Sequence, residues 1–261
     1  MNENPETTSA GEANQSVELT ARSLGVDRGW EWIAGGWRFF TAAPVLWIVC
    51  VILLAVIYVV LLRMGIAGQF LARALLSLMV AGLFFACNEL RAQRPLAISH
   101  LFAAFRDNAA PSVILGVLFS TACLLLGGLM KLMLIATIGS AAFAGLMTTE
   151  DPMVLVATVA AFGAGLLITV MVGLVLLVPI AMAMAFAPAL VLLDKMAPLA
   201  ALRASFDANL KNILPSALYG IVMLMLLVVG AIPAGLGLLV VGPLIVTSTY
   251  VAYREIFHGD K

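Results

Sequence analysis

The sequence predicts an all-α protein, a polytopic bundle of transmembrane helices, and three observations carry this prediction. Hydrophobic residues make up 63% of the 261 residues and charged residues only 11%, whereas a soluble domain carries roughly a quarter charged residues. Mean hydropathy is +1.12, and long charge-free tracts alternate with short polar islands, as in helical membrane proteins. The tracts lack the alternation expected of the strands of a transmembrane barrel.

The N-terminal residues 1–22 are expected to form a disordered acidic tail. Residues 1–21 contain four Glu and no Lys or Arg, so they lack the basic start and the apolar run of a secretory signal. Their low hydrophobicity favours disorder. We expect residues 23–257 to form a single transmembrane domain, followed by a short C-terminal tail, 258–261.

Apolar tracts divide this domain into six expected spans, since about 20 apolar residues cross a hydrocarbon core of about 30 Å. The expected spans are 44–62, 70–90, 111–131, 160–193, 215–232 and 236–254.

The middle of the chain leaves two alternatives open, because residues 153–193 contain no charge over 41 residues. Either the helices here are long and tilted, with an interfacial segment near 139–152, or an extra hairpin raises the number of spans to eight. In both cases Pro179 and Pro188 should kink the fourth span rather than end it.

The polar islands between the spans are expected to form short helices that lie on the membrane surface. Around residue 100, apolar side chains fall at the spacing of one helical stripe, and such a helix lies among the lipid headgroups with its apolar face inward. Similar stripes occur in the islands near residues 30 and 206. The residues expected at the membrane interface are Trp30, Trp37, Leu101, Phe102, Phe105, Leu202 and Phe206.

The islands and the spans after them form an internal repeat. Phe102, Asn108, Pro111 and Gly116 match Phe206, Asn212, Pro215 and Gly220 at a constant offset of 104 residues. The unit is an interfacial helix, a proline at the first position of the next helix and two spans, present three times. Transporters contain such repeats, but simple duplication in a structural membrane protein gives the same pattern, so both interpretations remain open.

Basic residues gather on one side of the expected bundle. The N-terminal flank, the two later islands and the C-terminus hold 11 of the 14 Lys and Arg residues, which leaves Arg63, Arg73 and Lys131 on the other side. Cytoplasmic loops of membrane proteins carry such an excess. We therefore expect a multi-pass protein of a bacterial inner (plasma) membrane with both termini in the cytoplasm.

No motif in the sequence indicates catalysis, a cofactor or a metal. Nucleotide-binding glycine motifs are absent, and the two histidines, His100 and His258, have no neighbouring cluster of Cys or carboxylate residues. We expect no catalytic, cofactor-binding or metal site and no enzymatic activity.

Polar residues at the cytoplasmic ends of the spans form the remaining candidate site. Ionisable residues in membrane segments are functional candidates by default, and Asn88, Glu89, Tyr250 and Arg254 could converge on a polar vestibule. The alternative is that these residues are interfacial anchors.

A resemblance to a known family is carried by two stretches, ALRASFDANLKNILPSALYG and GLGLLVVGPLIVTSTYVAYREIF. They resemble the BPSS-type family of uncharacterised proteobacterial integral membrane proteins and, more distantly, the glycerophosphodiesterase-associated membrane domain. The resemblance covers most of residues 28–257. Its most specific elements are Ser205, Phe206, Asn212, Pro215, Ser248, Tyr250, Tyr253 and Arg254. It implies a membrane location and a helical fold, and no activity, because the family has no defined function.

The sequence thus predicts a non-enzymatic integral inner-membrane protein of undefined role, whose interfacial helices contact anionic lipid. The alternative is a transporter or a lipid-handling membrane protein. Membrane lipid is the expected partner, nucleic acid is not expected, and the sequence identifies no protein partner.

Overall fold

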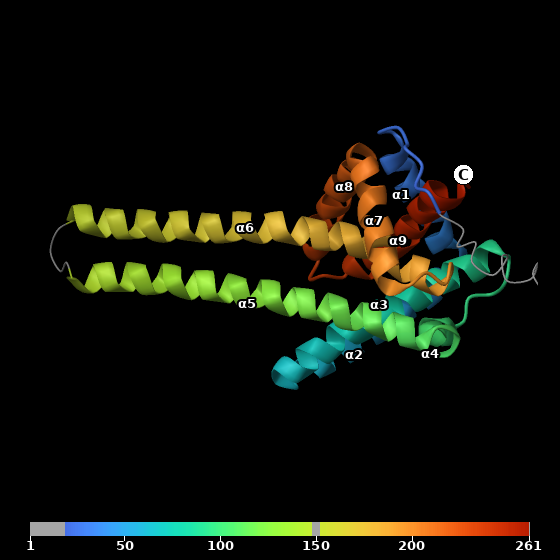
Figure 1. Cartoon of the computed structure of the whole chain (residues 1–261), viewed down its shortest axis with the longest axis horizontal. Helices are drawn as coiled ribbons and strands as arrows, with labels where there is room; N and C mark the ends of the chain where they lie inside the picture. Colours follow the sequence, from blue (N-terminus) through green and yellow to red (C-terminus); the bar gives the residue numbers. More distant parts are fainter. Residues whose placement is uncertain (1–18, 148–151, 261) are drawn as a thin grey trace, which may run out of the picture.

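The computed structural model describes residues 19–147 and 152–260, and these residues form helices, turns and connecting segments without a β-strand. The prediction of an all-α chain is confirmed for this part. Residues 1–18 of the expected acidic tail and Lys261 lie outside it. The helices are α1 (Arg28–Ala42), α2 (Pro44–Leu62), α3 (Gly65–Arg91), η2 (Ile98–Phe102), α4 (Ala103–Asp107), α5 (Ala109–Met147), α6 (Pro152–Leu192), α7 (Pro198–Lys211), α8 (Ile213–Ala231), α9 (Leu238–Tyr253) and η3 (Arg254–His258) (Figure 1).

Five helices of the described chain are long and apolar enough to cross a membrane: α2, α3, α5, α6 and α8. Helix α9, with 16 residues, is shorter. It continues directly into the π-helical turn η3, so the helical stretch is longer than α9 itself. The fold is therefore that of a helical membrane protein, with a sixth, shorter apolar helix at the C-terminus.

Helices α5 and α6 are much longer than the expected spans, with 39 and 41 residues. At 1.5 Å per residue each is about 60 Å long, twice the thickness of a hydrocarbon core. They run side by side and project well beyond the other helices (Figure 1). Both are continuous within the described residues, so the extra hairpin of the eight-span alternative does not occur there. Pro179 and Pro188 lie inside α6.

The core lies at the opposite end, where the polar islands meet. Helix α1 packs against α9 and α8, and α3 packs against α2, α5, η2 and α9. The largest fully buried side chains include Trp32, Trp47, Tyr250 and Tyr253. The fold thus consists of a densely packed end and the hairpin of α5 and α6, which extends away from that end.

The two repeated prolines do not stand at the first helical position as expected. Pro111 is the third residue of α5 and Pro215 the third of α8. The first four N–H groups of a helix have no partner within it, so proline is still accommodated there. The residues before these helices make long-range bonds, since the Asn108 side chain donates to the Val191 carbonyl (2.7 Å) and that of Asn212 to the Arg22 carbonyl (2.7 Å).

The island near residue 100 forms two short helices, η2 and α4, rather than one regular α-helix. Gly82 of α3 allows the backbone of η2 to come very close, because a Cβ at this position would lie 2.3 Å from the Leu101 carbonyl oxygen. This contact buries Leu101, which is only 1% exposed, while Phe102 and Phe105 remain about 40% exposed. Leu101 was expected to face lipid, and here it faces protein instead.

Candidate functional site

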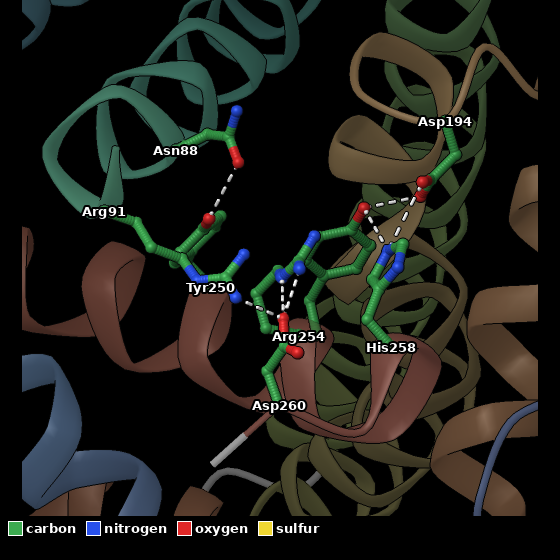
Figure 2. A network of polar contacts seen from close by, with 8 residues as sticks. Asn88, Arg91, Asp194, Tyr250, Arg254, His258 and Asp260 are labelled. Atoms are coloured by element: carbon green, nitrogen blue, oxygen red, sulfur yellow. Dashed lines mark hydrogen bonds and ion pairs between the residues drawn. The ribbon is translucent and has the colours of Figure 1, made fainter. Parts of the chain in front are cut away.

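A polar cap lies where the C-terminal ends of α3, α6 and α9 meet (Figure 2). Asn88 and Arg91 come from α3, and the other members follow α6 or belong to α9, η3 and the residues after it. The cap consists of Asn88, Arg91, Asp194, Tyr250, Arg254, His258 and Asp260, together with Tyr253, which bonds Asp194. Gly259, with a φ of +72°, ends the helix and turns the chain so that Asp260 reaches back to Arg254.

One half of the polar cap is centred on Asp194. The Tyr253 hydroxyl donates to Asp194 Oδ2 over 2.5 Å. His258 Nε2 lies 3.0 Å from the Tyr253 oxygen and 3.3 Å from Asp194 Oδ1. Tyr253 is fully buried. These three groups therefore join the end of α6 to α9 and η3.

The other half is centred on Asp260. Arg254 Nε donates to Asp260 Oδ2 over 2.9 Å, and Arg91 Nη2 lies 2.7 Å from the same oxygen. Beside them the Tyr250 hydroxyl donates to Asn88 Oδ1 over 3.1 Å. The C-terminal residues are thus bound to the end of α3.

The pKa values of His258 and Asp260, the two cap residues that follow Arg254, are both shifted. Burial, together with the nearby charge of Arg254, lowers the pKa of His258 although Asp194 acts in the other direction. Burial acts to raise the pKa of Asp260, but the hydrogen bond and charge of Arg254 and the charge of Arg91 outweigh it and lower that pKa. The cap therefore favours a neutral imidazole and an ionised Asp260.

A second polar cluster joins α1 to η3 next to the cap. Glu255, which is 5% exposed, lies 2.5 Å from Arg28 Nη2 and accepts a hydrogen bond of 2.7 Å from Trp32 Nε1. Glu31 also pairs with Arg28. Burial acts to lower the pKa of Arg28, but its bond to Glu255 and the neighbouring acids raise it. A buried carboxylate thus fixes the first helix to the last.

A third polar contact lies where α7 meets α6. The Ser205 hydroxyl donates to the Met182 carbonyl over 2.7 Å and accepts from the Phe186 amide over 3.0 Å. Met182 and Phe186 are four residues apart, so this hydroxyl bonds both groups of one helical hydrogen bond of α6, a known cause of helix bending. The Asn209 side chain donates to the same carbonyl over 3.0 Å.

The expected vestibule is brought together in part. Asn88 and Tyr250 are bonded to each other, and Arg254 joins them through its place in the polar cap. Glu89 does not take part, because it pairs with Arg94 over 3.0 Å. Tyr250 and Tyr253 are buried, the polar groups of the cap bond to one another, and these contacts hold the helix ends together.

The residues expected at the membrane interface are found in three kinds of environment. Trp30, Trp37, Phe102 and Phe105 are exposed, Leu202 and Phe206 are half-buried, and Leu101 is buried. The exposed aromatic residues lie on α1, η2 and α4, all of which are attached to the packed end.

Sequence reasoning did not identify several members of these clusters. Asp194 and Trp32 were not among the candidate residues, and His258 and Asp260 were assigned to the C-terminal tail. One available signal was a polar stripe along α7 and α8, with Ser205, Asn209, Asn212 and Ser216 at i, i+4, i+7 and i+11. These residues lie on one helical face and make the contacts of α7.

Within residues 19–147 and 152–260, no group of three or more His, Cys, Asp and Glu side chains is placed to hold a metal ion. Comparison of the chain with protein-family models, with curated proteins and with solved structures finds no match.

Proposed function

We propose that this chain is a multi-pass protein of a bacterial inner membrane without enzymatic activity, which crosses the membrane six times and has both termini in the cytoplasm. The observation that carries the proposal is that the polar islands meet at one end of the fold, while the long apolar helices extend away from that end. Lys195 donates to the Asp107 carbonyl, Lys211 to the Ala21 carbonyl, and Arg91 pairs with Asp260. Four stretches rich in basic residues thereby share one side, as the positive-inside rule requires.

The state of the polar groups supports a non-enzymatic role. The acid, imidazole and phenol groups of the polar cap bond to one another, and Tyr253 and Glu255 are buried. A general acid or base needs a substrate proton within hydrogen-bond reach, and these groups already use their bonds within the protein. We therefore propose that the cap stabilises the helix ends and serves as the cytoplasmic anchor.

Contact of the interfacial elements with anionic lipid is part of this proposal. Trp30 and Trp37 are exposed on α1, and Phe102 and Phe105 are exposed beside Arg106. Tryptophan favours the headgroup level, phenylalanine belongs to the apolar face of an interfacial helix, and each nearby Arg or Lys adds about 1 kcal/mol of attraction to an anionic surface.

Alkaline phosphatase fusions test the topology. Fusions after residues 108 and 212 should be inactive, and fusions after residues 66 and 150 active, because only the latter sites would reach the periplasm. Activity after residue 212 would contradict the proposed orientation.

A pair of substitutions tests the lipid contact. Phe102→Asp should expose the island to protease in inside-out vesicles without preventing membrane insertion, because Phe102 is 40% exposed. Leu101→Asp should instead destabilise the packed end, since it places a carboxylate against α3. Unchanged protection in the Phe102→Asp protein would show that this face contacts protein.

A second candidate function, that of a transporter or lipid-handling protein, is favoured by one observation. A cavity of about 490 Å³ lies between α6 and α8, within the helices that are apolar enough to span the membrane.

We also propose that the chain belongs to the BPSS-type family, because a helical fold with five apolar helices of membrane-spanning length agrees with what the resemblance implies.

A further inference from the structure

The cavity between α6 and α8 has the size and lining of a binding site. Its volume of about 490 Å³ falls within the range of about 300–1,000 Å³ typical of small-molecule sites. Most of its lining comes from α6 and α8, and Trp32 of α1 and Ala252 of α9 also contribute. The lining is almost entirely apolar, so a chain of CH₂ groups is a better match than a polar solute.

The cavity opens toward the surroundings of the two helices. Val178 of α6 and Ile221 and Leu224 of α8 line it, and all three are more than half exposed. Both helices are apolar enough to cross a membrane. If they do, hydrocarbon from the bilayer is the material that reaches this opening.

Polar side chains also line the cavity, and they already have hydrogen-bond partners within the protein. They include Asn209 near the C-terminal end of α7, Ser216 near the start of α8 and Thr249 near the C-terminal end of α9. The Ser216 hydroxyl donates to Asn209 Oδ1 over 3.1 Å, and the Thr249 hydroxyl donates to the Ile245 carbonyl over 2.7 Å. These groups lie on the side of the bundle that carries the polar islands and α7, so a headgroup would lie on this side.

A comparison of two matched glycines explains why the space is open. A Cβ at Gly116 of α5 would lie 2.7 Å from the Ala74 carbonyl oxygen of α3, which means that these two helices are in close contact. At Gly220 of α8, no described atom lies within 4 Å of the Cβ position, and Gly220 lines the cavity. The two copies of the repeat therefore differ at this position. Helices α5 and α3 are in close contact at Gly116, whereas a cavity lies between α8 and α6 at Gly220.

Contacts on both sides hold α6 and α8 apart. Ser205 and Asn209 attach α6 to α7 at Met182. Helix α8 packs against α1 and α9 instead, and a Cβ at Gly29 of α1 would lie 2.5 Å from the Pro215 carbonyl oxygen. The opening is thus built into the fold by specific contacts.

We propose that this cavity binds one acyl chain of a membrane phospholipid, whose headgroup lies at the α7 end in the cytoplasmic leaflet. The inference rests on the proposed membrane location and adds a binding site to it. An acyl chain is the occupant because the opening faces the bilayer and the lining is apolar. The polar groups of the lining already have hydrogen bonds within the protein, so they do not select a polar ligand.

Native mass spectrometry of the full chain, extracted from membranes with its lipids in polymer nanodiscs, tests the site. The wild-type protein should retain one phospholipid per chain. Gly220→Phe, which fills the cavity from α8, and Ala181→Phe, which fills it from α6, should each lower the retained lipid about tenfold. Gly127→Phe on α5 is the matched control, because the Cβ position of Gly127 also has no described atom within 4 Å but lies outside the cavity.

Equal retention in the cavity variants and in Gly127→Phe would overturn the site. Retention of another amphiphile, lost in the cavity variants, would overturn the choice of phospholipid. Carbonate washing of the same membranes separates the two proposals. A protein released by carbonate contradicts the membrane location, whereas a protein that resists carbonate but retains no lipid contradicts only the binding site. Circular dichroism confirms that each variant is folded.

Discussion

Helices α3 and α6 are both long enough to cross a membrane, yet they differ in what surrounds them. In the most apolar part of α3, 61% of the residues are buried inside the protein, against 6% in that of α6. The mean hydropathy of these parts runs the other way, 2.1 for α3 and 2.8 for α6. The more apolar helix is thus the less buried one, because in a membrane protein high hydropathy reflects contact with lipid rather than with protein.

The composition of α3 fits this difference. Gly82 admits the backbone of η2, and Asn88 bonds Tyr250 of α9. Small and polar residues enable helices to approach and bond in a membrane. Helix α6 makes polar contacts with other elements near its C-terminal end, at Met182, Phe186 and Val191.

The largest expected effect on stability comes from the ion pair between Arg28 and Glu255 at the packed end. Glu255→Ala should lower the free energy of unfolding by about 3–5 kcal/mol, because it leaves Arg28 without its buried partner. Lys131→Ala on the exposed part of α5 should leave the stability unchanged. Chemical denaturation in mixed micelles measures both, and similar values for the two variants would contradict the contrast between the two regions.

A pair of glycine substitutions compares α3 and α6 directly. Gly82→Ala should destabilise the protein by about 1–3 kcal/mol, since its new methyl group would overlap backbone atoms of η2. Gly163→Ala in α6 should stabilise it by about 0.5–1 kcal/mol, because alanine favours helix and no described atom lies within 4 Å of the Cβ position. A destabilising Gly163→Ala would reveal a protein contact on this face.

Removal of the hydroxyl that joins α7 to α6 should have a smaller effect. Ser205→Ala should cost about 1 kcal/mol, as expected for a buried hydrogen-bonding group, because Met182 and Phe186 can still bond each other. Thr121→Ala is the control, since its exposed hydroxyl bonds only the Val117 carbonyl of its own helix. Urea-dependent unfolding of the two variants should separate them.

The smallest expected effect is a dependence on pH at the packed end. The pKa of His258 is lowered in the folded protein from its ordinary value of 6.5, so below that value the unfolded chain binds more protons. Stability should therefore decrease as the pH falls from about 7.5 to about 5.5. Asp194, Tyr253, Arg254 and Asp260 surround this group. His258→Gln should flatten the slope of the unfolding midpoint against pH, and an unchanged slope would assign it to other groups.

The sequence predicts which segments form helices better than it predicts where those helices end. The expected span 44–62 coincides with α2, whose tract begins at Pro44 and ends before Arg63. The end of α5 was misplaced because Lys131 was interpreted as the end of the helix. A charge marks a change of surroundings, and no helix-breaking proline stops α5 there, so the backbone remains helical to Met147.

One contact of the site was predictable from the order of the apolar tracts. Asn88 and Tyr250 lie near the C-terminal ends of α3 and α9, which is why they were expected to meet. The contact of Tyr253 with Asp194 bridges 59 residues, and no periodicity relates residues on different helices. Leu101 was misassigned for a related reason, since its burial depends on Gly82 of another helix.

The bond between Trp32 and Glu255, which joins residues 223 positions apart, sets an order of events during synthesis. At about 5–20 residues per second, Glu255 follows Trp32 out of the ribosome by about 10–45 seconds. The contact of α1 with α9 therefore forms only after α9 has been made. Helices α5 and α6, neighbours in the chain, can pair as soon as both exist. The hairpin of α5 and α6 can thus form before the contact between α1 and α9 that closes the packed end.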